Sequence, residues 1–293
     1  MTHEYRQTGK RKSRNGYSPS VILTVFMAAF SLIYIFPFVL LCVNSFKPEK
    51  DIFNIGAKID FTYLENFKIV FAQPGFYSAV MLTVIICVVT LICAIFCSSM
   101  SGYIVSRATR GVIKNFYWIF VITMIIPYQS GMAILYNLGV KVRLINTVPY
   151  LIFIYLGGNV SYSSLIYYAF TKSIPRELEE SAKMDGCGKF MTFYKIIFPL
   201  LLPATGTIIA TQVFWYWNDM QGPLIYLGAG IGRSPKPLML FINNFRVNVG
   251  SYSYQLYAPV SALCLVSCIP MIVFFLCTQR YLIRGLVVGA IKG

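Results

Sequence analysis

Few residues of this sequence could do acid–base or metal chemistry. The chain of 293 residues has a single histidine, His3, which lies in a polar N-terminal stretch. A histidine-based metal site or a catalytic triad therefore has no ligand or base to use. The Gly-x4-Gly-Lys-Ser/Thr pattern that cradles ATP phosphates does not occur either. We therefore expect no catalytic residues, no metal and no cofactor bound by this chain.

Eight cysteines are spread over the chain, and seven of them lie in long apolar runs. No Cys-x-x-Cys pair occurs. Cys93 and Cys97 are four residues apart, as are Cys264 and Cys268, so each pair shares a helix face. A metal or redox site is one interpretation, but we favour small apolar packing residues.

An acid, Asp219, ends an aromatic segment at the close of an apolar run. A charge within or beside a membrane segment is a candidate functional group. Aromatic faces and amide groups beside it would suit a polar solute such as a sugar. The alternatives are an interfacial aromatic belt with a solvated carboxylate, and amide side chains that bond neighbouring helices. The residues that we predict for a translocation path are Gln129, Gln212, Trp215, Trp217, Asn218 and Asp219.

A short acidic segment, residues 173–188, carries a helix pattern. Pro175 suits a first turn, and the acids that follow it suit the positive end of a helix dipole. Gly186 or Gly188 can end the helix. Such a helix is too short to cross a membrane, so we place it at the membrane surface. A solvated amphipathic loop helix is the plain interpretation. The residues that would share one face are Leu178, Ala182 and Asp185.

The elements that must position these groups are membrane helices. The chain is 57% hydrophobic and only 12% charged, with a mean hydropathy of +0.66. These values exclude an ordinary soluble enzyme and a disordered chain. Runs without any charge are long enough to cross a bilayer as helices. The predicted fold class is thus all-α integral membrane, with six spans at 21–43, 77–105, 115–137, 148–171, 197–220 and 258–280.

The net charge of +15 could indicate nucleic acid, but in so apolar a chain basic residues mark cytoplasmic loops and anionic lipid. With the N-terminus inside, the cytoplasmic segments hold 16 of the 25 Lys and Arg residues. We therefore place both termini in the cytoplasm and expect no nucleic-acid partner. The predicted organisation is a tail at 1–20, a six-helix transmembrane domain at 21–280 with an inner loop at 172–196 and an outer loop at 221–257, and a tail at 281–293.

The inner loop resembles a known transporter motif. Residues 180–186 and 196–199 follow the Glu-Ala-Ala-x3-Gly-x9-Ile-x-Leu-Pro pattern of the EAA loop in ABC importer permeases. Ser181 replaces an alanine and Phe198 replaces a leucine, which are small or apolar exchanges. Met124-Ile125-Ile126-Pro127, Trp217-Asn218-Asp219 and the ending Gly289-Ala290-Ile291-Lys292-Gly293 extend the resemblance over most of the chain. It is similar to binding-protein-dependent sugar permeases, of the type of the shorter maltose permease.

The resemblance implies a type I ABC importer permease of the MetI-like fold, in which a cytoplasmic EAA coupling helix docks on a separate ATPase. ATP and magnesium would bind that ATPase. The implied partners are a second, non-identical permease, an ATPase dimer and an extracellular solute-binding protein that contacts 221–257. The implied location is the bacterial inner membrane, and the solute is a sugar or oligosaccharide. The implied ATPase-coupling residues are Glu180, Ser181, Ala182, Asp185, Gly186, Ile196 and Pro199.

Two other function classes are weaker. A secondary carrier or channel for a small polar solute would need its own ion-coupling carboxylates within the membrane, and only Asp219 is available. A membrane-embedded enzyme would need a nucleophile with a base, or a metal set. We therefore interpret the chain as a transport subunit that is not itself an enzyme.

Overall fold

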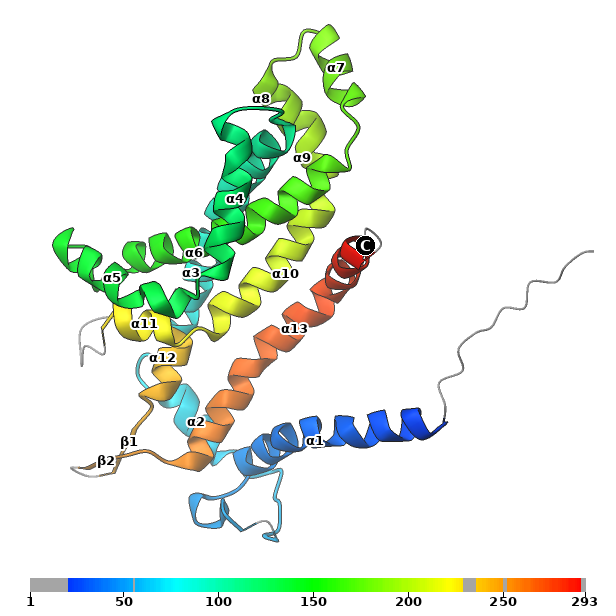
Figure 1. Cartoon of the computed structure of the whole chain (residues 1–293). Helices are drawn as coiled ribbons and strands as arrows, with labels where there is room; N and C mark the ends of the chain where they lie inside the picture. Colours follow the sequence, from blue (N-terminus) through cyan, green and yellow to red (C-terminus); the bar gives the residue numbers. More distant parts are fainter. Residues whose placement is uncertain (1–20, 55, 229–235, 250–251, 291–293) are drawn as a thin grey trace, which may run out of the picture.

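Long helices make up most of the computed structural model, which describes residues 21–54, 56–228, 236–249 and 252–290 (Figure 1). Both predicted tails therefore fall at least partly outside the described residues, and so do residues 229–235 of the outer loop. The elements in chain order are α1 (Val21–Ser45), η1 (Glu49–Asp51), α2 (Glu65–Ala72), α3 (Phe76–Arg107), α4 (Val112–Ile125), α5 (Tyr128–Lys141), α6 (Val148–Lys172), α7 (Glu177–Met184), α8 (Lys189–Thr192), η2 (Phe193–Ile197), α9 (Phe198–Leu200), α10 (Leu202–Asn218), α11 (Gln221–Tyr226), α12 (Leu238–Asn243), β1 (Val247–Val249), β2 (Tyr252–Tyr254) and α13 (Tyr257–Ala290).

Three helices among the described residues are long and apolar enough to cross a membrane: Leu23–Ser45, Phe76–Arg107 and Tyr257–Gln279. The number rises to five if each of two bent helix pairs counts as one span. The helix α6 has 25 residues, about 37 Å at 1.5 Å per residue, but it is richer in serine, tyrosine and glycine. The chain is a multi-pass membrane protein, and the count of six spans stays a prediction.

The predicted span over 115–137 is not one continuous helix. The chain forms two helices there, α4 and α5, which are bent by 98°. Ile126 is extended, with φ −75° and ψ 117°, because a residue before proline is pushed out of the helical region. Pro127 then begins α5. At 14 residues, α4 alone is about 21 Å long, which is shorter than a hydrocarbon core.

The expected helix over 197–220 is bent as well, by 69° between Lys189–Leu200 and Leu202–Asn218. The bend lies at Leu201, two residues before Pro203. Proline has no N–H, and its ring crowds the carbonyl four residues earlier, which here belongs to Pro199. The straight part, α10, therefore has only 17 residues.

Small residues let α3 and α6 pack closely. Ala94, Ser98, Gly102 and Ser106 recur every four residues on α3 and all are buried. Ser101 and Ser164 lie 2.7 Å apart, oxygen to oxygen, across the two helices. A Cβ on Gly102 would lie 2.7 Å from the Ser164 carbonyl oxygen. Close backbone approach over small residues is the usual way in which membrane helices associate.

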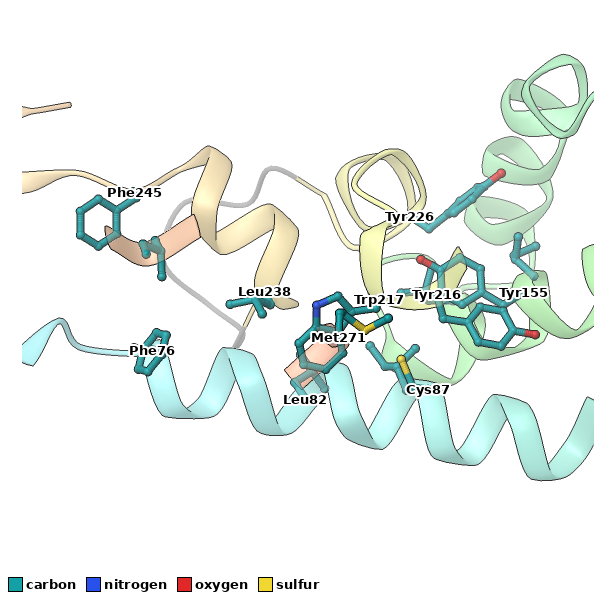
Figure 2. Close-up of a cluster of buried hydrophobic side chains, with 14 of the residues drawn as sticks. Phe76, Leu82, Cys87, Tyr155, Tyr216, Trp217, Tyr226, Leu238, Phe245 and Met271 are labelled. Atoms are coloured by element: carbon teal, nitrogen blue, oxygen red, sulfur yellow. The ribbon is translucent and has the colours of Figure 1, made fainter. Parts of the chain in front are cut away.

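Two clusters of buried side chains hold the bundle together. The larger one joins α3, α6 and α10 to the short helices α11 and α12, with Leu82, Tyr155 and Trp217 among its members (Figure 2). Cys87 is buried in the same cluster, as expected for a packing residue. The smaller one is built around Tyr167 and Ile197. Its Tyr167 hydroxyl lies 2.8 Å from Thr205 Oγ1, so it also links α6 to α10.

The bundle has two distinct ends (Figure 1). The α7 end carries the short helices α7 and α8. The hairpin end carries α2, α12 and the antiparallel hairpin β1–β2, in which Val247 pairs with Tyr254 and Val249 with Tyr252. The helix α1 extends away from the bundle, and no residue of its most apolar stretch is buried against the rest of the chain. Its exposed apolar side chains suit contact with lipid.

A loop carboxylate caps α13 at the hairpin end. Glu49 accepts hydrogen bonds from the backbone N–H groups of Tyr257 (3.0 Å) and Ala258 (2.8 Å), at the N-terminus of α13. The same loop is held by the Asn66 side chain, which donates to the carbonyls of Ser45 and Lys47. The segment that joins α1 to α2 is therefore tied to a helix that lies 208 residues away in sequence.

We expect Glu49→Ala to destabilise the purified chain by about 1–2 kcal/mol, because two N–H groups of α13 would lose a charged acceptor. Thermal unfolding in detergent measures this. Glu65→Ala is the matched control, since Glu65 pairs with Lys68 at an exposed site and such pairs contribute little. Equal unfolding midpoints for the two variants would contradict the capping role.

Candidate functional site

The helix α7 is a short, exposed element with a defined start and end. Its first turn carries three acids, which stabilise the positive end of the helix. Gly186 follows with φ +81°, in the left-handed region. The Cys187 N–H donates to the Ala182 carbonyl (2.9 Å) and the Gly186 N–H to the Lys183 carbonyl (3.1 Å). This pair of bonds is a Schellman motif, so the choice between Gly186 and Gly188 as helix terminator falls on Gly186.

The residues predicted for coupling fall into two groups. Glu180, Ser181, Asp185 and Gly186 are exposed on α7 and its end. Ala182 is 3% exposed and packs within the chain itself. The remaining two lie in other elements that lead into α10: the half-buried Ile196 in η2, and the exposed Pro199 in α9.

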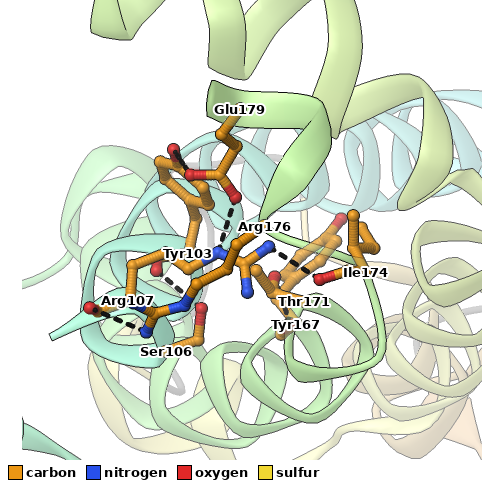
Figure 3. A network of polar contacts seen from close by, with 8 residues as sticks. All are labelled: Tyr103, Ser106, Arg107, Tyr167, Thr171, Ile174, Arg176 and Glu179. Carbon is orange, nitrogen blue, oxygen red and sulfur yellow. Dashed lines mark hydrogen bonds and ion pairs between the residues drawn. The ribbon is translucent and has the colours of Figure 1, made fainter. Parts of the chain in front are cut away.

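Glu179, a residue that the sequence analysis did not single out for coupling, holds α7 to α3 (Figure 3). Its carboxylate accepts from Arg107 Nε at 2.6 Å and from the Tyr103 hydroxyl at 2.8 Å. Arg107 also donates through Nη2 to the carbonyl of Ile174 (3.0 Å). The side chains of this ion pair are only 14% and 20% exposed. A charge-assisted contact so shielded is stronger than a surface ion pair.

A cavity of about 840 Å³ adjoins this ion pair. Apolar side chains from α3 and the α8 region, such as Ile104 and Phe190, line it together with Glu180 and Lys183 of α7. The helix α7 is therefore packed only loosely on this side.

The second candidate site surrounds Asp219, at the corner between α10 and α11. Its carboxylate accepts from the Tyr155 hydroxyl (2.7 Å) and from the backbone N–H groups of Gln221 (3.0 Å) and Gly222 (3.1 Å). A Cβ at Gly222 would lie 2.5 Å from the carboxylate and 3.0 Å from Tyr155 Cε1, so any larger residue would push these two side chains aside. Asp219 thus fixes a corner of the fold, which neither sequence interpretation of this residue included.

Only some of the residues predicted for a translocation path line a common hollow. An open hollow of about 460 Å³ is lined by Thr211, Phe214, Trp215, Asn218 and Asp219. Trp217 instead points into the core towards Leu82 and Met271 (Figure 2). The reason is that neighbouring residues of a helix face different directions. Gln212 is 3% exposed and Gln129 is exposed on α5, and neither lines the hollow.

We expect Asp219→Ala to destabilise the chain by about 1–3 kcal/mol, because it leaves the Tyr155 hydroxyl and two N–H groups without their acceptor. Asp219→Asn keeps one acceptor oxygen and should cost less. Thermal unfolding of the purified chain measures both. Asp185→Ala, at an exposed position, is the control. A midpoint for Asp219→Ala equal to that of the control would contradict the corner role.

Curated proteins of high similarity are permeases. The chain is 32% identical over 272 residues to the probable starch degradation products transport system permease protein AmyC of Thermoanaerobacterium thermosulfurigenes, covering 92% of this chain and 96% of AmyC. It is 30% identical to the melibiose/raffinose/stachyose import permease protein MelC and 31% identical to the arabinooligosaccharides transport system permease protein AraQ, both of Bacillus subtilis. Each match covers 93% of this chain and 96% of the relative.

Solved structures of similar fold come from a bacterial ABC transporter involved in the import of the acidic polysaccharide alginate. One chain matches with a TM-score of 0.74 and 20% identity, over 89% of this chain and 95% of that chain. A second, from a complex with an alginate pentasaccharide-bound periplasmic protein, has a TM-score of 0.60 and 16% identity, over 88% and 93% of the two chains. At this identity the matches support the expected permease fold.

A family model matches residues 91–288, which include α6, α7, α10 and most of α13. The match covers both candidate sites. The chain therefore belongs to the family of binding-protein-dependent transport system inner membrane components.

Proposed function

We propose that this chain is a membrane-spanning permease subunit of an ATP-binding-cassette importer for a sugar or oligosaccharide. The observation that carries the proposal is α7, an exposed helix at one end of a membrane bundle, tied to α3 by a shielded ion pair. Glu180, Ser181 and Asp185 are exposed on it, free to meet another protein. A helix presented in this way suits docking into a groove of a separate ATPase.

The proposed transport is driven by ATP hydrolysis on that ATPase, and this chain performs no catalysis. The α7 end then faces the cytoplasm with both termini, in the inner membrane of a bacterial cell. The distribution of lysine and arginine supports this orientation. The proposed partners on this basis are an ATPase dimer and a second, non-identical permease.

The proposed solute is supported by the relatives and by the hollow. AmyC is named for starch degradation products, MelC for melibiose, raffinose and stachyose, and AraQ for arabinooligosaccharides. Trp215 and Asn218 line the hollow and would offer a sugar an aromatic face and an amide. The hairpin end would meet an extracellular solute-binding protein, as suggested by the related transporter in complex with a periplasmic protein.

The test is gentle purification of the chain from its native membrane, followed by reconstitution into liposomes. We expect a P-loop ATPase and a second permease to co-purify. Uptake of one of three probes, maltotriose, raffinose or arabinotriose, should then require both ATP and a solute-binding protein. A chain that arrives without an ATPase, or that moves sugar without ATP, would instead be a secondary carrier.

A further inference from the structure

The helix α7 makes few packing contacts with the rest of the chain. Of its eight residues, Ala182 alone is buried. Beside it lies the cavity of about 840 Å³, so side-chain packing on that side is incomplete. A displacement of α7 therefore has few contacts through which it could move the membrane helices.

The hydrogen bonds that hold α7 and the segment before it converge on one end of α3. Glu179 accepts from both Arg107 and Tyr103, which are four residues apart and so lie on one face of α3. Arg107 binds back to the Ile174 carbonyl, and Arg176 donates to the Arg107 carbonyl at 3.4 Å. Side chain and backbone of Arg107 thus hold the segment at 174–179 through three hydrogen bonds (Figure 3).

The helix α3, to which this segment is bonded, is itself packed firmly against its neighbours. From Arg107, α3 runs back through Gly102 and Ser98, where it packs closely on α6. Its other end reaches the hairpin end, where Thr83 Oγ1 accepts from the Leu238 N–H at 2.7 Å. A displacement of Arg107 would therefore shift α3 at both the α7 end and the hairpin end of the bundle.

We propose that Arg107, Glu179 and Tyr103 form the link that transmits movement of α7 to α3, so that they are positioning residues for transport and not docking residues. This inference rests on the proposed function. An ion pair suits the task because it resists both separation and sliding, and because two donors on one carboxylate fix its orientation.

The test compares Glu179→Gln with Glu177→Gln in the reconstituted importer, with maltotriose, raffinose and arabinotriose as probes. Glu177 is an exposed acid of the same helix, and no hydrogen bond or ion pair to its side chain occurs within the described residues. For Glu179→Gln we expect the ATPase to co-purify as before, and the sugar imported per ATP hydrolysed to fall by about tenfold or more, the size of a typical coupling free energy. Glu177→Gln should keep the wild-type ratio.

A second variant tests whether the geometry of the Arg107 side chain matters in addition to its charge. Arg107→Lys keeps the charge but cannot bind the Glu179 carboxylate and the Ile174 carbonyl as a rigid fork, so the ratio should be intermediate. If Glu179→Gln does not fold, Tyr103→Phe takes its place, since it removes one hydrogen bond and should lower the ratio severalfold.

A wild-type ratio in Glu179→Gln, or in Tyr103→Phe where that variant is used, would overturn the link. Loss of the co-purified ATPase in the same variant would also overturn it, because the residue would then act in docking. The proposed function fails separately, and earlier, if the wild-type chain itself has no ATPase partner or imports sugar without ATP.

Discussion

Replacing Gly186 with valine is expected to abolish ATP-driven sugar uptake while the chain still inserts into the membrane. Gly186 has φ +81°, which costs an L-residue about 1–2 kcal/mol and a β-branched residue more. No atom lies within 4 Å of the Cβ that the substitution would add, so the effect comes from the backbone and not from a clash. The two bonds that end α7 would break, and its exposed face would turn away from the ATPase.

The measurement is uptake of the transported probe sugar by the reconstituted importer, with membrane insertion followed separately by the yield of purified chain. Gly188→Val is the matched control, because Gly188 has equally open space but an ordinary φ of −69°. Gly186→Asn should be intermediate, since asparagine tolerates the left-handed region better than valine. Full uptake in Gly186→Val would show that the geometry of this helix end does not matter, and would remove the docking role of α7.

The sequence predicts the apolar segments of this fold well, and prolines within them mark where a helix can kink or begin, but it does not predict how sharply each helix bends. Long charge-free runs place the helices because lipid leaves the backbone no other partner. Pro127 and Pro203 are visible in the sequence, yet proline in a membrane helix can begin it, kink it or be tolerated. Here the neighbouring residues Ile126 and Leu201 leave ideal helical geometry, which depends on packing that the sequence does not display.

The candidate site at α7, like the fold, could be predicted in part from the sequence. The exposed helix and its terminating glycine follow from local chemistry, because caps and positive φ have strong residue preferences. The ion-pair partner of Arg107, in contrast, does not follow from local chemistry. Charge counting places Arg107 and the acids of the inner loop on the same side of the membrane, but only the fold shows that Glu179, and not its neighbour Glu180, turns towards α3.

Asp219 illustrates the same limit. Its position after the aromatic run suggested either a path residue or a solvated belt, and each reading treats the carboxylate as free. In the structure both of its oxygens accept hydrogen bonds from the chain. A carboxylate with these partners is better suited to holding the α10–α11 corner than to binding a solute, which leaves Trp215 and Asn218 as the stronger path candidates.

The second large effect is expected at Gly102, where leucine should prevent the chain from reaching its folded state. Even the Cβ would lie 2.7 Å from the Ser164 carbonyl oxygen and from Tyr167 Cβ, and 3.0 Å from the Tyr168 backbone nitrogen. These are backbone atoms or atoms next to it, so they cannot move aside as a flexible side chain could. Separating α3 from α6 would also break the contact between Ser101 and Ser164. We expect a loss of more than about 3 kcal/mol, beyond ordinary overpacking.

The measurement is the yield of monodisperse chain in detergent together with its thermal unfolding midpoint. Gly157→Leu is the matched control, because Gly157 lies in α6 with no atom within 4 Å of an added Cβ. Removing that helical glycine should leave stability unchanged or raise it by about 0.5–1 kcal/mol. Gly102→Ala should fall between wild type and Gly102→Leu. Equal yields and midpoints for the leucine variants at 102 and 157 would mean that α3 and α6 are not in backbone contact, and α3 could then no longer serve as the rigid element that receives movement from α7.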